Sequence, residues 1–539
     1  MRPGGADGPI VSEHGDREPR QPERQRYAAA SDPPFYDDEE TVLLYRQAVP
    51  AARQEVSSPS GYPVDEKTLQ IARRLIAGAD APSVGKAKKE KASRSADRSL
   101  AKNSTMLLAN LIVGSVGGFV FYTVLARLYS THDVGVASAA FSSTSLIVSL
   151  SGLGGFTYSL VRMLPEISDK RALINAALMV VGVASLAIGV VFVAWPPATG
   201  HSVTLQDPVF ASVFVIGGVV TALKGVLDSL HNAHRDAPMI LAGGVLTTVV
   251  RIILPVVAVS FGVLGIYLSQ AVATGCGLVL LAISLMSRHH HGFRVQIRIP
   301  DGQEFVRLSG VNYLTSIVGG LPVALLPLLV VSHLGPEQNA VWSIAMLIAS
   351  ACFMLPSAIS QALLAEGAHN PDERMRLLRR STVVLFALLT PIILAGIFLA
   401  PYGLAVFGDE YRDGGVYALR ILLLSGFLVA GNYVAGAVLF FAKEVTVPLV
   451  VNILNAALVL ILTAAWATSL RDVATYWFLG EILNVVLFGA GAVHAARGLQ
   501  ARERGGARRS HAAKRGAERR RELRSALRHA PGRGKSRPS

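Results

Sequence analysis

The chain has 539 residues, of which 51% are hydrophobic and only 16% charged, and its formal net charge is +14. A soluble globular chain is typically about 25% charged, so this composition excludes an ordinary soluble enzyme. The two cysteines, Cys276 and Cys352, both lie in apolar runs, which excludes a disulfide-stapled secreted protein. The first thirty residues hold no apolar stretch, so we expect no signal peptide.

The charges are unevenly distributed along the chain. Residues 1–102 hold 17 Lys and Arg and 16 Asp and Glu, residues 103–496 hold 19 and 18, and residues 497–539 hold 15 and 3. The composition of the first segment predicts a disordered cytoplasmic tail. Its stretch 64–79 has helical apolar spacing and could form an amphipathic helix on the membrane surface or only a transient helix. The last segment is expected to be a basic cytoplasmic tail beside anionic headgroups rather than a nucleic-acid binder.

Twelve segments of the middle region are apolar over the roughly 20 residues that a spanning helix needs. In chain order they are residues 106–126, 134–156, 172–194, 209–228, 239–260, 263–286, 308–331, 339–361, 380–400, 416–440, 445–466 and 473–495. Most breaks between them carry charged or turn-forming residues, and the shortest is Phe261-Gly262. The pattern predicts an all-α, polytopic membrane protein.

The placement of Lys and Arg predicts the direction in which the spans run. With the N-terminus in the cytoplasm, the inner loops hold thirteen of these residues and the outer loops three, Arg127, Arg412 and Arg471. Because cytoplasmic loops carry the excess of Lys and Arg, we expect both termini in the cytoplasm. We expect a multi-pass protein of a bacterial plasma membrane.

The two halves of the spanning region share a short pattern. Asn110 lies seven residues before Gly117, and Asn312 lies seven residues before Gly319, at an offset of 202 in both cases. Internal repeats are common in transporters. Six spans in each half give both halves the same orientation, so a pseudo-two-fold axis along the membrane normal would relate them, with a cleft between.

The repeat predicts an N-lobe of spans 1–6, residues 103–300, and a C-lobe of spans 7–12, residues 301–496. Span 7 also contains Pro322 and Pro327. Because proline removes a helical hydrogen bond and bends a helix, span 7 is expected to be a kinked, lengthened counterpart of span 1.

Motifs of enzymes are missing from the sequence. It has no Gly-x4-Gly-Lys-Ser/Thr loop, no His-Glu-x-x-His and no Cys-x-x-Cys. The longest predicted outer loops have about fifteen residues, which is within ordinary connection lengths. The run His289-His290-His291 has no fixed fourth ligand nearby and belongs with a basic inner loop. We expect neither an enzyme nor a metal site.

Polar side chains inside the spans are the main candidates for a functional site, because such groups are costly in a bilayer. Arg251 lies about twelve residues, or roughly 18 Å, from the inner end of span 5, too deep for its side chain to reach the surface. Two interpretations are open. Arg251 could bind an anionic substrate, or it could form an internal ion pair with Glu481.

Three further arginines lie at span ends, where each could anchor its helix at the membrane interface or bind substrate. Together with Arg251 and the two repeated asparagines they make up the candidate substrate-binding set: Arg251, Arg127, Arg162, Arg420, Asn110 and Asn312.

The acidic candidate is Glu481, which shares one face of span 12 with Asn484, as Asn452 and Asn455 share one face of span 11. A carboxylate beside amides in the membrane could exchange protons. Alternatively, the four residues could join spans 11 and 12 through hydrogen bonds. We treat them as a candidate coupling site for a proton or a sodium ion, and we expect no other cofactor.

The stretch 103–166 resembles the opening of a known transporter family. The likeness is carried by Gly117-Gly118-Phe119, Leu125-Ala126-Arg127-Leu128-Tyr129-Ser130, Val134-Gly135-Val136-Ala137-Ser138, Ser151-Gly152-Leu153-Gly154, Arg162 and Leu164-Pro165-Glu166. These residues resemble the polysaccharide exporters, which are the O-antigen, teichoic-acid and exopolysaccharide flippases of the multidrug/oligosaccharidyl-lipid/polysaccharide (MOP) superfamily. The likeness covers residues 103–496 and neither tail.

The resemblance implies two six-helix lobes that alternate their access to the two sides of the membrane. It also implies a cationic central cavity and a polyprenyl-pyrophosphate-linked glycan as cargo, often exchanged for an ion. Arg251 fits such a cavity. Span 1 has no acidic residue, so the proton site of many drug-extruding relatives cannot be transferred to this chain.

The leading hypothesis is a flippase of the lipid bilayer that exports lipid-linked oligosaccharide or polysaccharide precursors for the cell envelope. Glycosyltransferases or glycan-polymerising proteins would be its partners, and nucleic acid would not. The first alternative is a drug or cation antiporter of the same superfamily, although only Glu481 supplies an acidic group at depth. The second is a transport-inactive membrane scaffold for envelope synthesis. Short outer loops disfavour a membrane glycan polymerase.

Overall fold

The computed structural model describes residues 84–152, 169–194, 207–288, 292, 302–369, 374–442, 444 and 446–497, and the regular elements in these ranges are helices. The labelled helices are α3 (Val84–Leu128), α4 (Thr131–Leu150), α6 (Lys170–Ala194), α7 (Pro208–Ala233), α8 (Ala237–Val257), α9 (Gly262–Arg288), α10 (Gly302–Leu334), α11 (Pro336–His369), α12 (Arg374–Ala405), α13 (Asp409–Ala442) and α14 (Thr446–Trp466). A further helix, Leu470–Arg497, follows α14.

Twelve helical segments in the described part of the chain are long and apolar enough to cross a membrane. Each of them overlaps one of the twelve spans expected from hydropathy, and most of their ends differ from the expected ones by a few residues. The largest difference is at span 10, which was expected to begin at residue 416, whereas α13 begins at Asp409. The expected class, an all-helical membrane protein, is confirmed.

Local residues explain where several spans begin. The side chain of Ser130 accepts a hydrogen bond from the backbone N–H of Asp133 and caps α4. Asp207 caps α7 in the same way through Val209. The shortest expected break between spans, Phe261-Gly262, is also observed. The helix α8 ends at Val257, and α9 begins at Gly262, whose φ of 54° favours glycine.

The chain divides into two compact units, Met1–Lys91 and Ala92–Ser539. In the first unit, the structure describes only residues 84–91, where α3 begins. The second unit holds all twelve spanning segments. The expected amphipathic helix at 64–79 and the basic tail beyond Arg497 lie outside the described residues.

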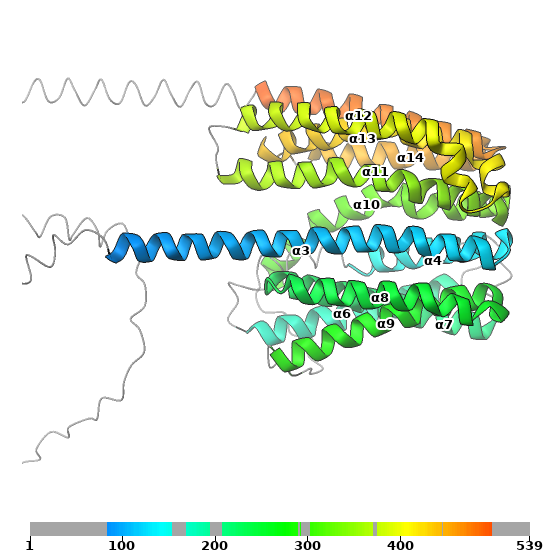
Figure 1. Ribbon diagram of the computed structural model, residues 1–539, viewed down its shortest axis with the longest axis horizontal. Coiled ribbons are helices and arrows are strands. Elements are labelled where there is room, and N and C mark those ends of the chain that lie inside the picture. Colours follow the sequence, from blue (N-terminus) through cyan, green and yellow to red (C-terminus); the bar gives the residue numbers. More distant parts are fainter. Residues whose placement is uncertain are drawn as a thin grey trace, which may run out of the picture. The chain divides into compact units, whose positions relative to one another are not determined.

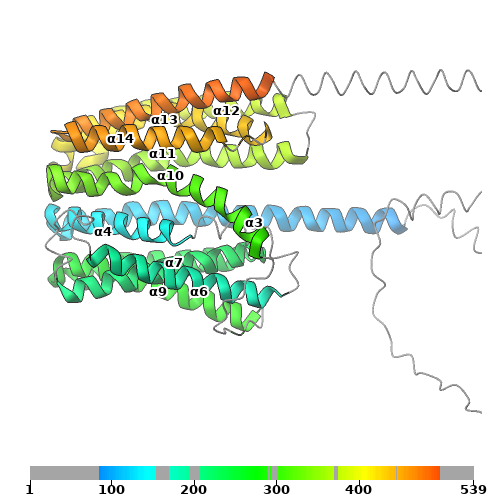
Figure 2. The ribbon, with the colours of Figure 1, turned by 180° about the vertical axis from the view of Figure 1, so that it is seen from behind.

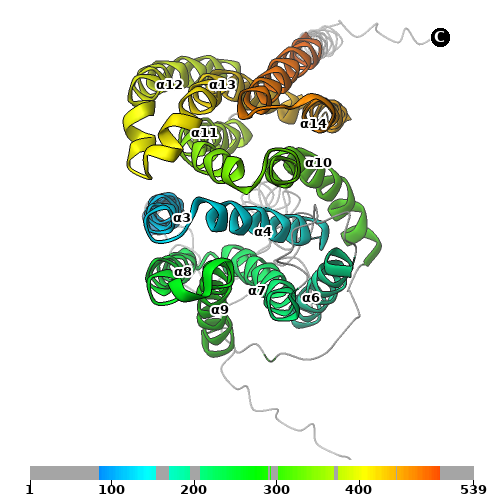
Figure 3. The ribbon, with the colours of Figure 1, turned by 90° about the vertical axis from the view of Figure 1, so that its right-hand side faces the viewer.

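The spanning helices form two bundles (Figure 1). Seen from the end in Figure 3, α6–α9 lie on one side of α4 and α10–α13 on the other. The contacts agree, because α4 packs on α7 and α9 of its own bundle and on α10 and α11 of the other. Figure 2 shows α10 beside α4, and it shows a bend in α10, the helix that contains Pro322 and Pro327. The two-lobe architecture is therefore the one expected from the repeat.

The two lobes repeat a contact between their first and fifth spanning helices. In the N-lobe, Gly117 of α3 packs so closely on Thr248 of α8 that a Cβ added to the glycine would collide with its methyl group. In the C-lobe, a Cβ added to Gly319 of α10 would lie 3.2 Å from Nδ2 of Asn452 in α14. The glycines are 202 residues apart and their partners 204. The structure thus brings equivalent residues together in each half, as the repeat predicts.

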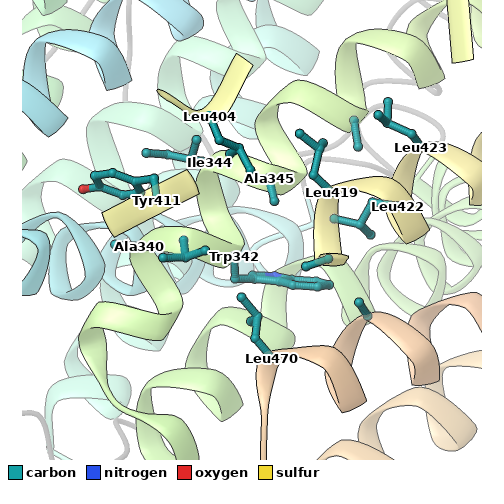
Figure 4. Close-up of a cluster of buried hydrophobic side chains, with 14 of the residues drawn as sticks. Ala340, Trp342, Ile344, Ala345, Leu404, Tyr411, Leu419, Leu422, Leu423 and Leu470 are labelled. Atoms are coloured by element: carbon teal, nitrogen blue, oxygen red, sulfur yellow. The ribbon is translucent and has the colours of Figure 1, made fainter. Parts of the chain in front are cut away.

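The largest apolar cluster fills the C-lobe and continues into the N-lobe. Figure 4 shows its centre, where the fully buried Trp342 lies among leucines of α13 and Leu470. Phe121 and Leu125 of α3 belong to the same cluster and are also fully buried. This shared core holds α3 and α4 against the C-lobe.

Candidate functional site

Within the N-lobe, a cavity of about 170 Å³ lies among α3, α4, α7, α8 and α9. Its polar lining consists of Tyr122, Thr144, Ser145, Thr221, Arg251, Tyr267 and Gln270. Every lining residue comes from the N-lobe, so this cavity belongs to one lobe and not to the space between the two.

Arg251 is the charged group of this cavity. Its Cζ lies 4.0 Å from the centre of the Phe121 ring, which is a cation–π contact. Its Nε is buried and has no hydrogen-bond partner in the described part of the chain. The ion pairs among the described residues do not include Arg251. The expected alternative of an ion pair with Glu481 is therefore not observed.

Most hydroxyl groups around the cavity are already hydrogen-bonded within the protein. The hydroxyls of Thr144 and Tyr267 are 2.6 Å apart, those of Tyr122 and Ser138 are 3.3 Å apart, and Thr221 donates to the carbonyl of Gly217. By contrast, Oε1 of Gln270 is buried without a partner. The unused polar capacity of the cavity thus lies in Arg251 and Gln270.

A half-buried ion pair near this cavity was not anticipated from the sequence. Lys224 and Asp228 of α7 lie 2.8 Å apart, Nζ to Oδ2. Their separation of four residues on one helix was the available signal, but hydropathy placed Asp228 at a span end. Because the pair is neutral overall, Lys224 adds no net positive charge to the cavity.

The C-lobe contains a second polar cluster, centred on Glu481. This residue is 8% exposed, and its Oε2 accepts a hydrogen bond of 2.8 Å from Nδ2 of Asn432 in α13. Asn484, one turn further on, interacts with the same carboxylate. Asn455 of α14 packs against Gly480, the residue before Glu481. Two helices therefore supply amide groups to one carboxylate, and the amide of Asn455 packs on the neighbouring Gly480.

Each of these three asparagines, Asn432, Asn455 and Asn484, has a buried Oδ1 without a hydrogen-bond partner among the described residues. Of the four residues expected to form a coupling site, the structure brings together Glu481 and Asn484, and Asn455 packs on the neighbouring Gly480. The fourth, Asn452, lies against Gly319 of α10 instead. Asn432 was missed, because a lone amide in a long apolar span gives no periodic signal.

The other expected substrate-binding residues do not gather around Arg251. Arg127 donates from Nη2 to the carbonyl of Val406 at 2.7 Å, and Arg420 donates from Nε to the carbonyl of Ile397 at 3.2 Å. The side chain of Asn110 packs against Gly244 of α8. Arg162 and the side chain of Asn312 lie outside the described residues.

The two lobes are joined at the end of the bundle where α3 ends and α4 begins, which we call the sealed end. The backbones of Gly135 and Pro336 meet there without room for a Cβ on the glycine. Asn339 of α11, which is fully buried, donates to the carbonyl of Gly135 at 2.8 Å. Thr131 donates to the carboxylate of Glu410 from the other lobe.

Two further contacts stabilise the sealed end. The hydroxyl of Tyr129, just beyond α3, donates to the carbonyl of Pro255 at 2.7 Å. Burial and the nearby carboxylate of Asp133 raise the pKa of Tyr129, so the hydroxyl keeps its proton and remains a donor. Arg127 also donates hydrogen bonds to the backbone carbonyls of Ala405 and Val406 in the C-lobe. The arrangement closes the space between the lobes at this end.

The chain resembles transporters in comparisons with known proteins. A family model described as MatE matches residues 323–466. No curated protein matches the chain in sequence. The likeness to solved structures extends over more of the chain, and it is a likeness of fold rather than of sequence.

Three solved structures illustrate this likeness. An inward-facing multidrug resistance MATE family transporter of the MOP superfamily has a TM-score of 0.56 at 15% identity and covers 74% of this chain and 99% of its own. The lipid II flippase MurJ, in an inward closed conformation, has a TM-score of 0.61 at 12% identity and covers 71% and 86%. A MOP superfamily transporter from Pyrococcus furiosus, described as having a binding pocket of reverse polarity, has a TM-score of 0.52 at 16% identity and covers 74% and 95%. The fold is therefore that of MOP superfamily transporters.

Proposed function

We propose that this protein exports an anionic, lipid-linked glycan precursor across a bacterial plasma membrane by alternating access. The observation that carries the proposal is Arg251, a guanidinium in a membrane-embedded cavity without a carboxylate partner among the described residues. A polyprenyl-pyrophosphate cargo brings the negative charge that such a cation binds well. The likeness to MurJ, described as a lipid II flippase, agrees with a cargo of this kind.

The sealed end gives the proposal a conformational basis. Contacts between Gly135, Asn339 and the C-lobe close one end of the bundle. With both termini in the cytoplasm, as the excess of Lys and Arg in the inner loops predicts, this end faces the outside. Cargo would then load from the cytoplasmic side, and release would require these contacts to separate.

A second candidate function is drug or cation antiport. Glu481 supports it, because its buried carboxylate and the surrounding amide oxygens suit a cation or a proton. The MatE match over residues 323–466 lies in the same lobe. In our proposal this cluster couples export to an ion gradient, whereas in an antiporter it would also bind the cargo.

Transport by purified protein in proteoliposomes separates these functions. We expect the protein to move a fluorescent polyprenyl-pyrophosphate oligosaccharide and not a lipophilic cationic dye. Arg251→Ala should lower glycan transport at least about tenfold, and Arg251→Lys should also be poor because the two-pronged hydrogen bonding of guanidinium is lost. Arg471→Ala is the matched control, because Arg471 also lies over an aromatic ring, that of Tyr417, but is exposed.

Transport of the dye without transport of the glycan would establish the antiporter instead. Transport of neither, by protein with a normal unfolding temperature, would support the transport-inactive scaffold. If Arg251→Ala exports the glycan as well as Arg471→Ala does, Arg251 does not bind cargo.

A further inference from the structure

The first two turns of α12 carry four arginines, and the whole helix contains no Asp or Glu. The first of them, Arg374, is held by the protein itself. Its Nε donates to the carbonyl of Gly367 at 2.7 Å, and its Cζ lies 5.1 Å from the centre of the Phe441 ring. By contrast, Arg379 and Arg380 are exposed and belong to no ion pair among the described residues. These two cations can therefore interact with a group outside the protein.

The two exposed arginines lie at the head of an exposed apolar stripe. Val383 and Val384, one turn after Arg379 and Arg380, are 64% and 45% exposed. Exposed apolar residues recur every three or four positions from there to Phe398, which is 79% exposed. The helix packs on α11 and α13 and lies at the edge of its lobe in Figure 3. Because residues three and four apart share one face of a helix, the arginines belong to the face that α12 presents to lipid.

The position of these arginines along the helix matches the headgroup layer of a membrane. At a rise of about 1.5 Å per residue, the stripe from Val383 to Leu399 covers roughly 24 Å of a hydrocarbon core of about 30 Å. Arg379 and Arg380 lie one turn, or about 6 Å, before the stripe begins. With the topology predicted from Lys and Arg, this end of α12 lies at the cytoplasmic face. The two guanidinium groups are then at the level of phospholipid phosphates.

The equivalent helix of the N-lobe does not present such a surface. The third spanning helices of the two lobes, α6 and α12, begin 204 residues apart. At this offset Arg379 and Arg380 correspond to Asn175 and Ala176, which are 5% and 0% exposed. The arginine surface is therefore a feature of one lobe and not a general property of the fold.

The chemistry of this surface fits the headgroup of an anionic phospholipid. A guanidinium forms two parallel, charge-assisted hydrogen bonds with a phosphate. Each basic residue near an anionic leaflet strengthens the association with lipid roughly fivefold. The apolar stripe directly beyond the arginines suits the acyl chains of the same lipid.

We propose that the start of α12 is a binding surface for an anionic phospholipid of the cytoplasmic leaflet. Arg379 and Arg380 bind its phosphate, and Val383 and Val384 contact its acyl chains. This interaction is independent of the cargo that the protein transports.

Quenching by brominated lipids tests this surface locally, with the full-length protein in phosphatidylcholine vesicles. A fluorophore is attached to a cysteine that replaces Val383, in a background without Cys276 and Cys352. The vesicles contain a series of mole fractions of brominated phosphatidylglycerol or brominated phosphatidylcholine. We expect the phosphatidylglycerol to quench as strongly as a roughly tenfold higher mole fraction of the phosphatidylcholine, because two arginines attract it. High salt should reduce this preference, since it screens exposed charges.

The double variant Arg379→Gln/Arg380→Gln should abolish the preference for phosphatidylglycerol. Its unfolding temperature should stay the same, because both side chains are exposed. The matched control is Lys170→Gln/Arg171→Gln, which removes the same charge from the exposed start of α6. This control should keep the preference.

Three results would overturn the proposal. Equal quenching by the two lipids in the unmodified chain would do so, and it would favour an acidic protein segment as the partner of this surface. Retention of the preference by Arg379→Gln/Arg380→Gln would exclude these arginines as the binding groups. An equal loss in the α6 control would assign the attraction to the cytoplasmic face as a whole. A failure of glycan transport would leave all these measurements unaffected, so the two proposals fail separately.

Discussion

The fifth spanning helices of the two lobes, α8 and α14, differ at a pair of equivalent positions. Thr248 and Asn452 each pack on a glycine of the first helix of their lobe, so Arg251 and Asn455, three residues further on, correspond to each other. In the N-lobe the position carries a cation beside the neutral Gln270 of the sixth helix. In the C-lobe it carries an amide that packs on Gly480, the residue before the acidic Glu481 of the sixth helix.

This difference indicates that a duplicated scaffold can assign opposite charges to its two halves. The shared helix packing keeps the positions equivalent, whereas the side chains at these positions differ in charge. Under the proposed function, the N-lobe cavity would bind an anionic group and the C-lobe cluster a cation or a proton. In a transporter, the two lobes would then divide cargo recognition and ion coupling between them.

The largest effect on stability is expected at the sealed end, which joins the two lobes. In Gly135→Ala, the new methyl group would meet the carbonyl oxygen of Pro336, and overpacking of this kind costs about 1–3 kcal/mol. We expect the end to open, so that a cysteine replacing the fully buried Ala137 reacts faster with a water-soluble thiol reagent. The measurement uses a background without Cys276 and Cys352.

Gly114→Ala is the control for this substitution. Gly114 lies on α3 with no atom within 4 Å of an added Cβ, and alanine favours a helix by about 0.5–1 kcal/mol over glycine. We therefore expect unchanged reactivity at position 137. Equal reactivity in the two variants would show that the sealed end does not hold the lobes together.

A loss of stability without opening of the sealed end is expected in the C-lobe cluster. Asn432→Leu removes the donor to Oε2 of Glu481, and a buried polar group left without its partner costs about 1–3 kcal/mol. Thermal unfolding of the purified protein measures this loss. In a Glu481→Leu background the same substitution should cost much less, because the partner is gone. An equal cost in both backgrounds would mean that Asn432 acts through packing alone.

The smallest effect is expected at Arg127, where the sequence left open an anchoring role and a cargo-binding role. Arg127→Ala removes the bonds to the carbonyls of Val406 and Ala405, at a cost of about 1–2 kcal/mol for a partly exposed site. The loss should appear in the unfolding temperature, with glycan transport in proteoliposomes unchanged. Weaker glycan transport by protein that remains folded would place Arg127 in the cargo-binding site.

The fold followed closely from the sequence because its determinants are strong. A spanning helix needs a long apolar run, and each of the twelve runs became a helix. The short break expected between spans 5 and 6 at Phe261-Gly262 is also observed, because Gly262 adopts a positive φ that favours glycine. The glycine repeat also succeeded, because Gly117 and Gly319 mark places where two helices approach closely.

The candidate sites followed less closely because they depend on the direction in which side chains point. Depth in the membrane drew attention to Arg251 and Glu481, but it did not identify the neighbours that the structure gives each of them, Phe121 and Asn432. Helical spacing put Asn452 and Asn455 on one face, yet Asn452 packs on α10 while Asn455 lies beside Gly480. Asn432 and the Lys224–Asp228 pair were missed, since their roles arise only from contacts with neighbouring groups.

The division of labour between the lobes is tested most directly by transport of a polyprenyl-pyrophosphate oligosaccharide in proteoliposomes, with and without a pH gradient. Glu481→Gln keeps the size of the side chain but cannot titrate. We predict that Arg251→Gln loses transport under both conditions, whereas Glu481→Gln retains transport down a cargo gradient and loses only its stimulation by the pH gradient. If both variants lose transport under both conditions, or if both lose only the stimulation by the pH gradient, the two lobes do not have separate roles.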